Sequence, residues 1–254
     1  MIRRLCGLIF VCMGVTPLAQ AMEDRADVEP NAPVSASQPI AYKLTLSQYR
    51  QTQDASSNDI NLRGNRDNDA FWLGHYMQGT DFQQTRAGYE HQSRWGRWRS
   101  VAGLQIASQG FVGGSWTWLY EPAELGPSWL LGWGRTNTQP YVNLNFDPND
   151  STLWGLGWRT ETSAWTLYQV KDDKLQTSQT VTHLVWRWSR ADAPSLAMDL
   201  FTREGRADKF SPLVSGTGLS LGLEQGAYFV RVVWDPRVNF TESDMLRIAA
   251  GRRF

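Results

Sequence analysis

Apolar and polar residues alternate with a period of two along most of the chain from Ala41 to Phe254. Successive side chains of a β-strand point to opposite faces, so this pattern indicates strands with one apolar and one polar face. No helical period of comparable length competes with it. We expect strands at residues 41–52, 69–78, 82–91, 97–108, 111–120, 128–136, 139–147, 151–160, 163–170, 180–190, 195–203, 216–224, 227–234 and 245–254.

Each expected strand has roughly the nine to eleven residues that a tilted strand needs to cross a bilayer. Turn-forming glycine, proline, aspartate or asparagine lies at every boundary. We therefore expect about 14 strands. Twelve is the alternative. It would follow if the two expected strands on either side of residues 108–110 were a single strand, or if the first expected strand and one other were absent.

The chain has 13 tryptophans, all between Trp72 and Trp234. Eight of them occur in pairs spaced by two or four residues, and the members of a pair share one face of a strand. On the outer face they would form the aromatic girdle of a membrane barrel. The alternative, the core of a soluble β-sandwich, would need a hydrogen-bond partner for each buried indole. The girdle candidates are Trp116, Trp118, Trp129, Trp133, Trp154, Trp158, Trp186 and Trp188.

The first residues have the pattern of a secretory signal peptide. Arg3 and Arg4 precede an apolar segment at residues 5–15, which is too short to span a bilayer as a helix. Ala19-Gln20-Ala21 matches a cleavage site, so we expect a signal peptide over 1–21 that is cleaved after Ala21. Residues 22–40 are polar and contain prolines, which indicates a disordered periplasmic leader.

Cleavage removes both cysteines, Cys6 and Cys12, and with them any disulfide, catalytic thiolate or cysteine-bound metal. It also removes two arginines from a chain whose formal net charge is zero. The remainder is slightly acidic, and no basic field points to a nucleic-acid partner.

The lengths of the connections give an orientation. If the chain starts in the periplasm, odd-numbered links are extracellular, and bacterial barrels keep their periplasmic turns short. The expected periplasmic links are residues 79–81, 108–110, 136–139, 161–163, 191–194 and 225–226. The longer extracellular links are expected around residues 53–68, 121–126, 171–179, 203–215 and 235–244.

The signal, the alternation, the tryptophans and the terminal Phe254 together resemble the Gram-negative outer-membrane β-barrel class, over about residues 41–254. There is also a loose similarity to small uncharacterised barrel proteins. The resemblance implies an all-β, antiparallel up-and-down transmembrane barrel in the outer membrane. It also implies that Phe254 is an assembly signal for the barrel-assembly machinery, and that lipid and lipopolysaccharide surround the wall. Arg252 departs from the class, because an apolar or aromatic residue is usual there.

The face opposite the tryptophans and leucines should line the lumen, because a charge facing lipid at mid-depth is costly. Basic residues outnumber acidic ones on that face. Two interpretations stay open: ion pairs that brace the wall, or a lumen that favours anions. The lumen candidates are Lys43, Arg86, Arg99, Arg159, His183, Arg187, Asp199, Glu224, Arg231 and Arg247.

Catalytic and metal motifs are sparse. His91-Gln92-Ser93 has the two-residue spacing found in outer-membrane phospholipases, without an evident acid or amide to orient the histidine. Aspartates at residues 147–150, 171–174 and 235–244 are typical of turns, although Ca²⁺ binding stays open. We assign no catalytic residue, metal or cofactor.

The sequence therefore predicts a porin-like, non-enzymatic barrel, most simply a narrow channel or binding barrel for small, anionic solutes. A plugged barrel that acts through its extracellular loops is the alternative. A lipid-modifying enzyme is a third hypothesis, and it depends on His91 and Ser93.

Overall fold

The computed structural model describes residues 39–52, 56–80, 82–137, 139, 141, 151–172 and 175–254. The expected signal peptide and most of the expected leader lie outside these ranges.

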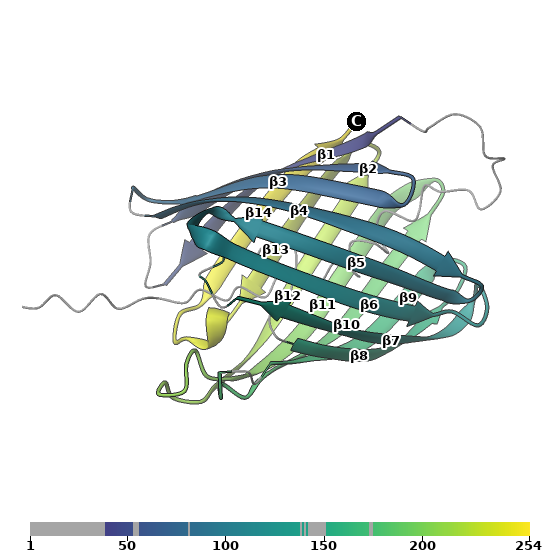
Figure 1. Ribbon diagram of the computed structural model, residues 1–254. Coiled ribbons are helices and arrows are strands. Elements are labelled where there is room, and N and C mark those ends of the chain that lie inside the picture. The colour runs from purple at the N-terminus through teal and green to yellow at the C-terminus, as the bar shows by residue number, and fades with distance from the viewer. Residues whose placement is uncertain are drawn as a thin grey trace, which may run out of the picture.

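Fourteen antiparallel strands in the described residues form one closed barrel, in which neighbours in sequence pair and β1 pairs with β14 (Figure 1). This confirms the predicted barrel of 14 strands, and the alternative of 12 is wrong. The strands are β1 (Ala41–Gln51), β2 (Ser57–Arg66), β3 (Asp69–Gln78), β4 (Phe82–Trp95), β5 (Trp98–Ala107), β6 (Phe111–Tyr120), β7 (Gly126–Thr136), β8 (Ser151–Arg159), β9 (Ser163–Asp172), β10 (Gln179–Arg190), β11 (Ala193–Gly205), β12 (Val214–Gln225), β13 (Tyr228–Asp235) and β14 (Met245–Arg253).

Two of the strands differ from the prediction. β2 lies within the segment 53–68 that was predicted to be a loop. Its inner face carries Asp59, Asn61 and Arg63, and only two large apolar residues, Ile60 and Leu62, mark its outer face. The alternation was therefore too weak to recognise.

The strand predicted over 139–147 lies mostly outside the described residues. β7 pairs directly with β8, from Gly126 opposite Arg159 to Trp133 opposite Thr152, so no strand stands between them in the wall. The predicted total of 14 is correct because two errors cancel: the prediction missed β2, and it counted a strand at 139–147 that is not part of the wall.

The missed strand also changes the ends at which several links lie. The end at which β1 begins and β14 ends, called the turn end here, carries links 67–68, 96–97, 121–125, 160–162, 191–192 and 226–227. The opposite end, called the loop end, carries links 52–56, 79–81, 108–110, 137–150, 173–178, 206–213 and 236–244. Each strand carries the chain to the other end of the barrel, so one missed strand puts every later link at the wrong end until a second miscount compensates. The links 79–81, 108–110, 121–126 and 136–139 were therefore predicted at the wrong end.

The barrel closes where its first and last strands meet. β1 and β14 pair continuously from Lys43 opposite Arg253 to Gln51 opposite Met245. Beyond these pairs, Tyr42 and Phe254 exchange two backbone hydrogen bonds of 2.8 and 2.9 Å. Their rings also stack with centroids 5.8 Å apart. The terminal aromatic residue therefore completes the closure of the sheet.

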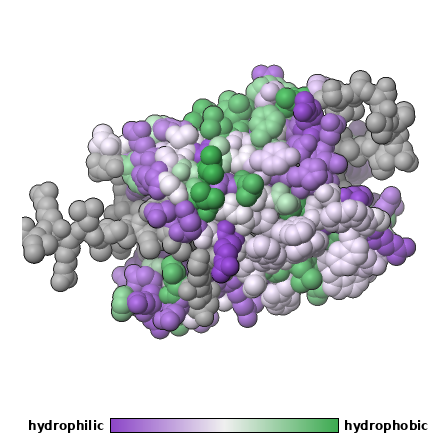
Figure 2. All heavy atoms as spheres, in the orientation of Figure 1, coloured by the Kyte–Doolittle hydropathy of each residue, from purple (hydrophilic) through white to green (hydrophobic). Residues whose placement is uncertain are grey.

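Apolar side chains project from the outer wall. Leu104, Ile106 and Leu73 are 63%, 58% and 57% exposed, and they alternate with buried or half-buried inward residues. In Figure 2 hydrophobic and near-neutral residues occupy most of the middle of the visible wall, while hydrophilic residues gather toward both ends. A closed sheet with an apolar belt satisfies its backbone hydrogen bonds and can face hydrocarbon, which is the architecture of a transmembrane β-barrel.

Among the described residues there is no helix with the length and apolar character needed to cross a membrane.

We expect Leu104→Arg to destabilise the barrel in lipid by about 2–4 kcal/mol, because it places a charge in the middle of the apolar belt. The measurement is urea unfolding of the protein refolded into phospholipid vesicles. Leu213→Arg is the matched control, since Leu213 is 50% exposed but lies in the β11–β12 link. Equal losses for both variants would contradict the position of the belt.

Candidate functional site

The inner face of the barrel gathers most of the charged strand residues. All ten lumen candidates from the sequence lie on this face, among buried or half-buried positions. The inner face also carries charged residues that are not among the candidates predicted from the sequence, including Asp59, Arg63, Arg203, Asp235 and Arg253. Asp59 and Arg63 fall in the predicted loop 53–68, because β2 was missed. Arg203 is the last residue of a predicted strand, and Asp235 is the first residue of a predicted link.

The acidic residues of the lumen pair with basic residues across the wall. Arg63 contacts Glu90 at 2.5 Å, and Arg86 contacts Asp59. On β10 and β11, Nδ1 of His183 lies 2.9 Å from Asp199. On β14 and β12, Arg253 holds Glu224 through bonds of 2.7 and 3.0 Å. Buried ions of this kind need such partners, because desolvation of a lone charge is costly. These pairs brace the wall, as one of the two interpretations expected.

Three arginines form a row on the inner wall near the turn end. Arg159 lies opposite Ala164, which lies opposite Arg187. The row continues from Arg187 through Ala197 and Gly222 to Arg231. Only small residues separate the three guanidinium groups, which are half-exposed to the lumen. We call Arg159, Arg187 and Arg231 the arginine row.

The turn-end mouth carries further positive charge. Lys43 and Arg253 are register partners, and both lie over the ring of Phe229, with Lys43 Nζ 4.6 Å from its centroid. Arg99 is buried near the start of β5, with Glu121 at 4.0 Å. Basic residues therefore outnumber acidic ones at this end of the lumen, which gives it a positive potential.

Apolar residues fill other parts of the interior. One cluster contains Leu119, Leu130, Tyr168, Val170 and Val185, from the inner faces of β6, β7, β9 and β10. Two more clusters lie toward the loop end, around Tyr49 and Tyr76 and around Val181 and Phe201. The described lumen is thus partly packed by side chains.

The link between β13 and β14 folds into the loop-end mouth. Its short 3-10 turn η3 (Val238–Phe240) is buried, with Val238 and Phe240 each 1% exposed. Val238 packs against Tyr49, Tyr76 and Met245. Phe240 packs in the cluster around Val181 and Phe201, which also contains Val233. The link therefore joins the apolar clusters of two flanks of the wall and narrows the mouth.

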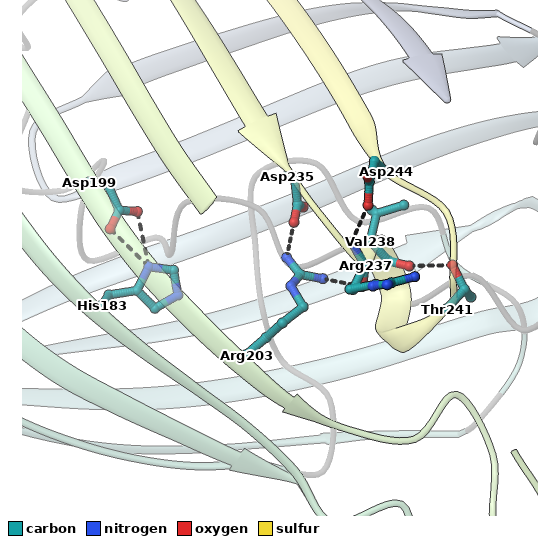
Figure 3. Close-up of polar contacts among 8 residues, drawn as sticks. All are labelled: His183, Asp199, Arg203, Asp235, Arg237, Val238, Thr241 and Asp244. Atoms are coloured by element: carbon teal, nitrogen blue, oxygen red, sulfur yellow. Dashed lines mark hydrogen bonds and ion pairs between the residues drawn. The ribbon is translucent and has the colours of Figure 1, made fainter. Parts of the chain in front are cut away.

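A buried ion pair holds this link in place (Figure 3). Arg203 and Asp235 lie 2.5 Å apart with side chains 1% and 2% exposed. Arg203 also donates to the backbone oxygen of Arg237 at 3.4 Å, and the Arg237 amide donates to Asp244 at 3.0 Å. Asn239 and Phe240 have positive φ angles of 57° and 58°, a costly conformation that surrounding contacts must impose.

The link between β7 and β8 also reaches the inner wall. Tyr141 is 6% exposed, stacks on Phe111 with centroids 4.0 Å apart, and donates a hydrogen bond to Gln105. Phe111 and Gln105 belong to the inner faces of β6 and β5. The sequence placed Tyr141 in a wall strand, whereas its side chain packs against the wall from inside.

The eight girdle candidates lie on the outer face. Trp116 and Trp118 stack at 4.7 Å, and the indole of Trp116 donates to Ser100 at 2.6 Å. Trp165, another outward residue, contacts Trp186 at 5.8 Å. By contrast, Trp72 points inward over Gly88, where an added Cβ would lie 2.3 Å from the indole.

His91 and Ser93, the residues of the enzyme hypothesis, lie on the outer face of β4 and not in the lumen. Residues 147–150 and 173–174 of the aspartate-containing loops lie outside the described ranges. Within the described ranges, no three His, Cys, Asp or Glu side chains gather closely enough to hold a metal ion.

No protein-family model and no curated protein matches the sequence. Solved porin structures share the barrel architecture. The KdgM porin is 8% identical over 84% of this chain and 99% of that chain, with a TM-score of 0.45. The NanC porin is 7% identical over 82% and 98%, with a TM-score of 0.48. An anion-selective porin from Comamonas acidovorans is 10% identical over 86% and 100%, with a TM-score of 0.45. With identities this low and TM-scores below 0.5, these matches carry no argument about what the chain does.

We expect Arg203→Ala to release the β13–β14 link, because removal of one partner from a buried ion pair costs about 3–5 kcal/mol. Trypsin should then cleave after Arg237 much faster than in the wild-type barrel. Arg206→Ala is the control, since Arg206 bonds to Ser211 in the neighbouring β11–β12 link. If both variants were cleaved at the wild-type rate, the ion pair would not be what holds the link.

Proposed function

We propose that this protein is an outer-membrane channel for small anionic solutes, with the arginine row as its selectivity element. The observation that carries the proposal is the row itself, in which three guanidinium groups face the lumen with only alanine and glycine between them. Rings or rows of basic side chains select for anions by lowering the energy of a passing negative charge.

The other lumen charges support the same function. Asp59, Glu90, Glu224 and Asp235 each pair with an arginine, so their negative charge is largely neutralised. The positive excess at the turn end remains. Small side chains along the row give room for a solute beside the guanidinium groups.

In this proposal the chain starts in the periplasm. The turn end, with its short connections, then faces the periplasm, and the loop end faces outward. Phe254 serves as the signal for the barrel-assembly machinery, and lipid and lipopolysaccharide cover the belt.

One observation favours the plugged barrel as a second candidate. The loop-end mouth is narrowed by a link whose Val238, Asn239 and Phe240 are all at most 2% exposed. In a channel, ions must pass beside this link, or the link must move out of the mouth. In a plugged barrel the link stays in the mouth, and the protein would act through its loops.

The deciding experiment is single-channel recording of the purified, refolded chain in a planar bilayer with a salt gradient. We expect steady conductance and a reversal potential that shows anion preference. A silent barrel that is properly folded, as judged by its heat-dependent shift on a denaturing gel, would overturn the channel and favour the plugged barrel.

We expect Arg187→Ala and Arg231→Ala each to lower the preference for anions by roughly threefold. One charge about 7 Å from a passing anion in water is worth about 0.6 kcal/mol. Arg252→Ala is the matched control, because Arg252 lies on the outer face with its guanidinium 5.5 Å from the ring of Tyr228. An equal change in Arg252→Ala would show that selectivity does not arise in the arginine row.

A further inference from the structure

The outer wall near the turn end carries a polar cluster that the channel does not use. Nδ1 of His91 lies 2.8 Å from an Asp69 carboxylate oxygen, and the Tyr89 hydroxyl donates to the same oxygen at 2.5 Å. Asp69 and His91 are register partners on β3 and β4. Ser93 is the next outward residue of β4 after His91.

The contact with Asp69 supplies the group that the sequence lacked. His91-Gln92-Ser93 showed the spacing of a histidine and a serine that share one face of a strand, without an acid to orient the histidine. Asp69 stands 22 residues earlier in the chain. Only the pairing of β3 with β4 brings it to His91.

These three side chains are the components of an activated serine. A carboxylate bonded to Nδ1 holds the imidazole in the tautomer whose Nε2 is basic, and it stabilises the imidazolium that forms when Nε2 takes a proton. A serine beside such a base is a nucleophile toward acyl groups. Ser93 and His91 are two residues apart on one face of β4. The esterase requires a bond from Ser93 to His91 Nε2, and such bonds often tighten only when substrate binds.

The hydroxyl of Ser100 lies across from Ser93, because the two residues are register partners on β4 and β5. Ser100 accepts the indole N–H of Trp116 at 2.6 Å, which leaves its own proton for donation. Ser100 is buried at 3% exposure, so we assign it no contact with a substrate.

An apolar groove adjoins the cluster. Trp95, Trp98, Trp118 and Leu131 line it. Ser93 and Ser100 share a register row with Trp118 and Leu131, and Trp95 pairs with Trp98 one step nearer the turn. The groove therefore begins beside the serine and faces the lipid. Its apolar lining is compatible with the acyl chain of a membrane lipid.

We propose that Asp69, His91 and Ser93 form a serine esterase site on the outer wall, which cleaves fatty acyl esters of membrane glycerolipids. Ser93 Oγ attacks the ester carbonyl carbon while His91 Nε2 takes its proton. The bond to the glycerol oxygen then breaks, and that oxygen leaves with the proton from His91. Water repeats the sequence at the acyl-serine, which releases the fatty acid and restores Ser93.

The first test uses the purified, refolded full chain and a fluorophosphonate probe, which labels only an activated serine. We expect labelling of Ser93, located by mass spectrometry, and its loss in Ser93→Ala and His91→Ala. The control is His75→Ala. His75 also lies on the outer wall, but its Nδ1 lies 2.9 Å from the hydroxyl of Thr85 and not from a carboxylate. An unlabelled Ser93 in a folded wild-type barrel would overturn the proposal.

Hydrolysis of a medium-chain p-nitrophenyl ester and of phosphatidylethanolamine vesicles gives the second readout. We expect Ser93→Ala and His91→Ala to lose about 100-fold or more in kcat/KM, while His75→Ala stays at the wild-type value. Asp69 is a positioning residue, so Asp69→Asn should lower kcat without raising KM, and Asp69→Glu should recover part of the loss. Full activity in Ser93→Ala would sink the assignment.

The two proposals fail separately. Ser93→Ala should conduct as the wild type does, and Arg187→Ala should keep its esterase activity, because the two sites lie on opposite faces of the wall.

Discussion

The backbone hydrogen bonds between β1 and β14 are the constraint on which the rest of this structure depends. Hydrocarbon offers no partner for an unpaired N–H or C=O group, so a sheet in a membrane must have no edge. The pairing from Lys43 to Gln51, extended by Tyr42 and Phe254, removes both edges at once. Closure brings the start of β1 beside the end of β14, and it gives every strand one face toward lipid and one toward the lumen.

That division into faces explains why one strand can serve two unrelated sites. β4 sends Arg86 and Glu90 inward to ion pairs with Asp59 and Arg63. The same strand sends Tyr89, His91 and Ser93 outward to the edge of the belt. Neighbouring residues therefore meet different solvents, and their chemistry diverges. The charges inside are paired because burial demands it, while the polar groups outside lie near the turn end, where polar headgroups are close.

The lumen is divided along the barrel axis as well. Basic residues gather toward the turn end, where the arginine row runs between alanine and glycine. Toward the loop end, apolar clusters and the inward β13–β14 link occupy the mouth, and Arg203 with Asp235 anchors that link. The structure thus has positive charge at the turn-end mouth, and at the loop-end mouth an inward link that a buried ion pair anchors.

The sequence by itself determined the class of fold and the face on which residues such as Lys43, Arg187 and Trp154 lie. Alternation is a local property, and each strand displays it without reference to its neighbours. The tertiary structure decided what depends on pairing between distant segments. It placed β2 in the wall despite its weak pattern, set the end at which each link lies, and folded Tyr141 and Phe240 inward. It also joined Asp69 to His91 and Arg203 to Asp235. Residues 22 and 32 positions apart meet only when strands pair and the sheet closes, and no local pattern encodes such a meeting.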